Sequence, residues 1–134
     1  MVATLSKPTT KEIPAQWSTI ERTVSRTLTH LGIFPCRKGH ALLRDAILYN
    51  LHNLYTFQTD FPKSLYKHLA EKHNCSEKTA ASNIHSAISA AQNAGTLERF
   101  NKLLGANVID EYSPLSNLQF ISLAAQYCYY NEKE

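Results

Sequence analysis

The segment from Leu65 to Ala91 constrains the fold most strongly, because its pattern is typical of two short amphipathic helices joined by a tight turn. The first helix places Leu65, Leu69 and Ala70 on one side. The second has the i, i+4, i+7, i+8, i+11 spacing of a buried stripe, made by Ala80, Ile84, Ala87, Ile88 and Ala91. This pattern predicts a helix-turn-helix, a motif whose second helix enters the major groove of DNA while the first crosses the backbone.

The predicted turn is the sequence His73-Asn74-Cys75-Ser76. Asparagine adopts the left-handed backbone region more readily than most residues, so Asn74 suits a sharp reversal of the chain. Serine is a preferred helix N-cap, and Ser76 stands directly before the second apolar stripe. The small Ala70 allows the second helix to pack closely. Local chemistry therefore supports the turn as well as the two helices.

Helical patterns also precede this pair. Apolar residues from Trp17 to Leu31 share one face, and Gly32 follows them as an expected C-cap. A second helix is predicted from about Gly39 to Tyr55, with a regular stripe in which Asn50 would need a hydrogen-bond partner if it were buried. Pro62 is placed as the first residue of the third helix, and Gly95 as the end of the fourth.

The remaining sequence predicts two more helices. A short one runs from about Glu98 to Leu104 and stops at Gly105. The last begins with Ser116 and Gln119 in capping-box spacing. It is expected to bury Ile121, Ala124, Ala125 and Cys128. Because no segment alternates with period two, the prediction is an all-α fold of about six helices, with a flexible tail over 1–16 and a helical domain over 17–134.

Composition excludes several classes of protein. A chain of 134 residues buries a sufficient core without metal or disulfides, and three cysteines at unrelated spacings favour a reducing compartment, here the cytoplasm. No apolar run approaches a membrane span. The histidines and cysteines lack the spacing of a zinc site, and neither a phosphate-binding loop nor a catalytic motif is present. We therefore expect no metal, no cofactor and no enzyme activity, while a net charge of +3 permits nucleic-acid binding.

The chain resembles a known family over about a hundred residues. The matching positions are Leu31-Gly32-Ile33, Pro35, Lys38-Gly39, Leu43-Arg44, Ala46-Ile47, Leu65-Tyr66, Leu69-Ala70, Lys72, Asn74, Ile84, Ala87-Ile88, Gly95, Leu104-Gly105, Asn117 and Phe120-Ile121. They are similar to the C-terminal DNA-binding effector domain of the stage-zero sporulation response regulator of endospore-forming bacteria. The resemblance implies six helices, a helix-turn-helix made by the third and fourth, and a transcription regulator that binds double-stranded DNA in tandem copies.

Two departures from that family are visible. Full-length members carry a receiver domain, whereas only a short segment precedes the first helix here, so we expect no phosphorylation control within this chain. The resemblance also implies arginines at the positions of Thr79, Ser82 and His85, and a glutamate at Ala81. Arginine is the best guanine-binding side chain, so its absence predicts an altered base preference.

Helical geometry selects the candidate DNA-binding residues. With Ile84 at the centre of the buried side, the opposite face and its flanks carry Lys78, Thr79, Ser82, Asn83, His85, Ser86 and Ser89. Lys63 and Lys67 on the preceding helix are candidate phosphate contacts, as are Lys72, Arg37, Lys38 and Arg44. An ordinary solvated polar surface is the alternative interpretation of both sets.

Three tyrosines in the last helix, Tyr127, Tyr129 and Tyr130, exceed what one buried stripe requires. They suit a dimer interface, since helical regulators often pair to match half-sites. The alternative is that they pack against the first helix and Trp17. Two functions stay open: a stand-alone DNA-binding regulator, or a paralogue that has lost DNA binding and acts through a protein partner such as the intact regulator or RNA polymerase.

Overall fold

The computed structural model describes residues 15–52, 61–110 and 115–131, with the side chains of 15–18 and of 61–62 left aside. These residues form helices and connecting turns, which confirms the all-α prediction for this part of the chain. The helices are α1 (Ala15–His30), α2 (Lys38–His52), α3 (Phe61–His73), α4 (Glu77–Asn93), α5 (Arg99–Leu104) and α6 (Asn117–Asn131). None of them is long and apolar enough to cross a membrane.

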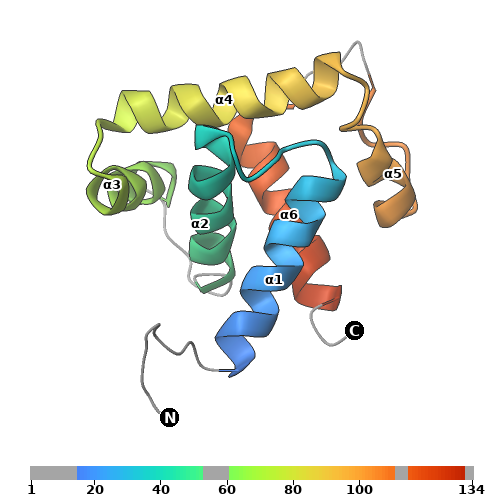
Figure 1. The fold of residues 1–134 in the computed structure, drawn as a ribbon, viewed down its shortest axis with the longest axis horizontal. Coiled ribbons are helices and arrows are strands. Elements are labelled where there is room, and N and C mark those ends of the chain that lie inside the picture. Colours follow the sequence, from blue (N-terminus) through green and yellow to red (C-terminus); the bar gives the residue numbers. More distant parts are fainter. Residues whose placement is uncertain (1–14, 53–60, 111–114, 132–134) are drawn as a thin grey trace.

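Helix α2 lies at the centre of the fold and packs against α1, α3, α4 and α6. Helix α4 runs across the ends of α2 and α6, as Figure 1 shows, with α3 and α5 to either side. The start of α1 and the end of α6 lie on the side of the molecule away from α4. One continuous core joins the helices, and its largest fully buried side chains include Phe100, Phe120, Leu28, Leu43, Ile84 and Ile88.

Local capping chemistry fixes the end of α1 and the start of α6 where the sequence predicts them. Gly32 has a φ of 89°, and the N–H of Ile33 donates to the carbonyl of Leu28 at 2.9 Å, which closes the C-terminus of α1. At the start of α6 the N–H of Ser116 donates to Oε1 of Gln119 at 3.0 Å, and the N–H of Gln119 donates to Oγ of Ser116 at 3.2 Å. This reciprocal pair is the predicted capping box.

Several predicted boundaries differ from the structure by one or two residues. Helix α1 begins at Ala15, inside the segment expected to be a tail, and α3 begins at Phe61, so that Pro62 is its second residue. Differences of this size are expected, because helix ends fray and periodicity does not fix the first residue of a helix. The expected tail over residues 1–14 and the end of the second predicted helix beyond His52 lie outside the described residues.

Helices α2 and α4 meet at Gly39, in the first turn of α2. A Cβ atom added to Gly39 would lie 2.5 Å from Cβ of Ala87 and 2.8 Å from the carbonyl oxygen of Asn83. No side chain fits between the two helices at this point, because the second of these atoms belongs to the backbone of α4. The crossing therefore depends on glycine.

Helices α2 and α3 are joined by the carboxylate of Asp45, whose side chain is only 3% exposed. Nε2 of His73 lies 2.7 Å from Oδ2, while Nε of Arg44 and Nζ of Lys72 lie 3.2 and 3.6 Å from Oδ1. Three nitrogen donors thus surround one buried acid, which fixes the end of α3 against α2.

The cysteines occupy three different environments and are unpaired. Cys36 is exposed, Cys75 is half-buried, and Cys128 is buried in α6. Burial raises the pKa of the Cys128 thiol to about 11, an effect opposed by its hydrogen bond to Oγ1 of Thr27 at 3.9 Å. This thiol is therefore neutral at physiological pH and behaves as a small apolar core residue.

The substitution Gly39→Ala tests the close approach of α2 and α4. Helix propensity alone predicts that alanine stabilises this position by about 1 kcal/mol. Because the added methyl group meets the α4 backbone, we expect a loss of about 1–3 kcal/mol instead. Urea unfolding followed by circular dichroism measures the sign. A variant as stable as the parent would show that the helices separate at no cost.

The substitution Asp45→Ala tests the link between α2 and α3. It removes a charge-assisted hydrogen-bond network, and we expect the free energy of unfolding to fall by about 1.5–3 kcal/mol. Asp45→Asn keeps one acceptor for His73, so its loss should be smaller. Equal stability of the parent and both variants would mean that the three contacts add nothing to stability.

Candidate nucleic-acid interface

The turn between α3 and α4 has the conformation that its residues predict. Asn74 has a φ of 54°, which lies in the left-handed region. Ser76 is the N-cap of α4, and its Oγ accepts a hydrogen bond from the N–H of Thr79 at 3.0 Å. The residues from Asn74 to Ser76 therefore reverse the chain and start a new helix within three positions.

Helix α4 has two distinct faces. Its core side is formed by Ala80, Ile84, Ala87, Ile88 and Ala91, all buried, as the stripe predicts. Its outer side carries the candidate DNA-binding residues. Lys78, Thr79, Ser82, His85 and Ser86 are exposed, and Asn83 is half-buried at one edge. In Figure 1 no other helix lies over this outer side of α4.

The outer side is polar and carries little charge. Lys78 is the only lysine or arginine in α4, and it follows Glu77 directly. The other exposed groups are neutral hydroxyls, together with His85, whose Nε2 lies 3.3 Å from Oγ of Ser89. Such groups hydrogen-bond to base edges and phosphates with low selectivity, whereas an asparagine amide pairs with adenine in two bonds. The outer side of α4 therefore offers hydrogen-bonding groups with little charge.

A shallow groove runs between this side of α4 and the start of α6. Its walls include Tyr66, Lys78, Ser82, His85 and Asn117. The Asn117 amide donates to Oη of Tyr66 at 3.1 Å and to the carbonyl of Ala81 at 3.0 Å, so it connects α6 to both helices of the pair. Its Oδ1 is buried without a hydrogen-bond partner among the described residues.

Sequence reasoning did not identify Asn117 as a structural link, because helical periodicity says nothing about contacts across the chain. The available signals were its match to the resembled family and its place as a polar residue at the first turn of a predicted helix. Its structural role is to hold α3 and α4 in a fixed mutual orientation.

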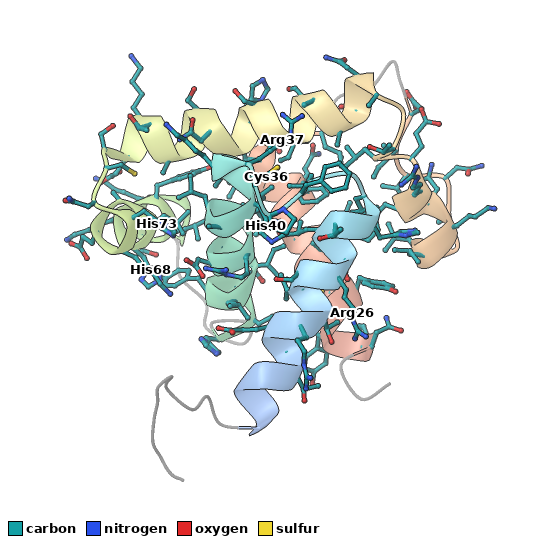
Figure 2. The ribbon with its side chains drawn as sticks, in the orientation of Figure 1. Arg26, Cys36, Arg37, His40, His68 and His73 are labelled. Carbon is teal, nitrogen blue, oxygen red and sulfur yellow. The ribbon has the colours of Figure 1, made fainter. Side chains whose placement is uncertain are left out.

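The predicted phosphate-binding cations fall into three groups. Lys63 and Lys67 are exposed on α3. Arg44 and Lys72 contact Asp45, as described above. Arg37 and Lys38 lie at the start of α2, directly beside α4, where Figure 2 labels Arg37. The structure therefore separates cations that are engaged with Asp45 from cations that are exposed on α3 or beside α4.

The tyrosines of α6 also have different surroundings. Tyr127 is half-buried and packs edge-to-face on Phe100 of α5, with ring centroids 5.8 Å apart. Tyr129 is 39% exposed and Tyr130 is 76% exposed. Their rings pack edge-to-face, with centroids 5.2 Å apart. Their expected dimer role stays a prediction.

Metal-ligating side chains do not cluster in the part of the chain that the structure describes, where no three of His, Cys, Asp or Glu lie close enough to hold an ion. His73 is hydrogen-bonded to Asp45, and the ring of His68 stacks on the ring of Tyr49 with centroids 4.6 Å apart. His40 is buried, and its Nδ1 lies 2.9 Å from the carbonyl of Ile33. These three histidines, all labelled in Figure 2, thus have structural partners.

Comparison with known protein families agrees with this arrangement. Residues 24–128 match the family model described as Sporulation initiation factor Spo0A C terminal. The match covers most of the chain, from the core of α1 to the buried end of α6. Domains of this family are DNA-binding effector domains of transcription regulators. This chain therefore belongs to the Spo0A C-terminal family.

Proposed function

We propose that this chain is a DNA-binding transcription regulator in which α3 and α4 form the helix-turn-helix. The observation that carries the proposal is the outer side of α4, which is uncovered, polar and held by the core on its other side. A helix presented in this way fits the major groove, while Lys63 and Lys67 of α3 are placed on the helix that would cross the phosphate backbone.

The side chains of α4 support a base preference different from that implied by the family resemblance. Thr79, Ser82 and His85 stand where the resemblance implies arginines, so the bidentate contact that reads guanine is missing. Asn83 offers the amide that reads adenine. We infer that the preferred site has adenine opposite Asn83 and few selected guanines.

A protein-directed role is the competing proposal. The neutral outer side of α4 and the exposed Tyr129 and Tyr130 favour it, since tyrosines bury a large area at low entropic cost. In that case the chain would act as an antagonist that binds the intact regulator or RNA polymerase. Absence of sequence-dependent DNA binding in the experiment below would favour this second function.

Fluorescence anisotropy with duplexes selected from a random pool tests the proposed function. The parent chain should bind the selected duplex far more tightly than a scrambled one, with a clear salt dependence. Asn83→Ala should weaken binding to the selected duplex about 5- to 150-fold and reduce discrimination at one base pair, because one bidentate contact contributes about 1–3 kcal/mol.

Two further variants of α4 complete this test. Lys78→Ala should weaken binding to all duplexes alike, and Ser82→Ala should also reduce the affinity. Ser122→Ala is the matched control, because Ser122 is an exposed serine on α6. Equal affinities of the parent for selected and scrambled duplexes would overturn the proposal.

The exposed tyrosine pair generates a separate prediction about self-association. If Tyr129 and Tyr130 form the centre of a homodimer interface, replacing both by serine should raise the dimer dissociation constant about thirtyfold or more. Sedimentation equilibrium measures this change. Tyr127 is left intact because it packs on Phe100. A parent chain that stays monomeric at all accessible concentrations would exclude this interface.

A further inference from the structure

We propose that Arg37 and Lys38 form a phosphate clamp beside α4 and supply part of the charge-dependent affinity for DNA. This inference rests on the proposed function, because it assigns the backbone contacts of the same interface. It adds phosphate contacts at the start of α2 to those proposed for Lys63 and Lys67, and leaves base reading to the neutral side chains of α4.

The position of the two cations carries the inference. Arg37 and Lys38 line a small hollow together with Gly39, Asn83 and Ser86. A second hollow brings Lys38 together with Thr79 and Asn83. Asn83, at the edge of the outer side of α4, lines both hollows. A duplex in contact with that side would therefore bring phosphates close to Arg37 and Lys38. Figure 2 shows Arg37 near the junction of α2 and α4.

The clamp is held rigidly in place. The N–H of Arg37 donates to the carbonyl of Phe34 at 3.0 Å, and the N–H of His40 donates to the carbonyl of Arg37 at 3.1 Å. Nδ1 of His40 donates to the carbonyl of Ile33, which fixes the preceding loop. Because Gly39 meets the α4 backbone directly, the backbone of Arg37 and Lys38 is held next to α4.

The charges around the clamp also support phosphate binding. Neither hollow has a carboxylate in its lining, and among the described residues Arg37 and Lys38 form no ion pair. Both side chains are exposed. Arg44 and Lys72, in contrast, are engaged with Asp45. Two unpaired cations in a polar hollow suit a phosphate group, which an arginine binds through two parallel N–H groups.

The salt dependence of DNA binding measures such contacts directly. Each phosphate neutralised by a protein cation releases counterions, which adds about 0.9 to the slope of log affinity against log salt. Removing both members of the clamp should therefore flatten this slope by about 1.8. Discrimination between the selected and scrambled duplexes should persist, because the base-reading side chains of α4 are intact.

The experiment compares two double variants by anisotropy on the selected duplex at several salt concentrations. Arg37→Ala with Lys38→Ala removes the clamp. Arg26→Ala with Lys102→Ala removes the same net charge from exposed positions on α1 and α5, and neither residue lines the hollows beside α4. We expect the clamp variant to lose affinity and slope, and the control variant to keep both. Circular dichroism confirms that each variant is folded.

The outcomes separate this inference from the proposed function. Equal slopes for the two double variants would overturn the clamp while leaving a DNA-binding regulator in place. Failure of the parent chain to distinguish the two duplexes would overturn the proposed function itself. If the double variant does not fold, Arg37→Gln and Lys38→Gln should each reduce the slope by about 0.9, and an unchanged slope in both would refute the clamp.

Discussion

The contact between α2 and α4 at Gly39 is the constraint on which the rest of the interface depends. It allows the first turn of α2 to touch the backbone of α4, so the central helix and the exposed helix are placed with little freedom between them. The outer side of α4, the loop before α2 and the start of α6 are all positioned relative to this crossing. A larger residue at the same place would shift every one of them.

Charge in this domain is divided between folding and binding. The carboxylate of Asp45 holds Arg44, Lys72 and His73 where α2 meets α3, while Arg37 and Lys38 have no such partner among the described residues. A count of basic residues near the helix pair therefore overstates the charge available to a ligand. In the proposed interface, Arg37 and Lys38 add to the charge of the single lysine in α4.

Features set by neighbouring residues could be predicted from the sequence, and those set by contacts between distant segments could not. Three local features have the expected form. They are the turn at Asn74, the N-cap at Ser76 and the capping box of Ser116 and Gln119. Periodicity likewise identified the exposed side of α4. In contrast, the burial of Asp45 and the bonds of Asn117 depend on which helices are adjacent, which no single-segment pattern contains. Knowledge of the adjacent helices was also needed to see that Arg44 contacts Asp45 while Arg37 lies beside α4.

The ends of the helical domain lie opposite its exposed helix, as the view in Figure 1 makes clear for the start of α1 and the end of α6. A protein or label joined at either position would therefore extend away from α4 and leave its outer side accessible. Two copies arranged side by side on a duplex would likewise have their attachment points on the side facing solvent. We therefore expect a fusion at the start of α1 or the end of α6 to leave the polar side of α4 unblocked.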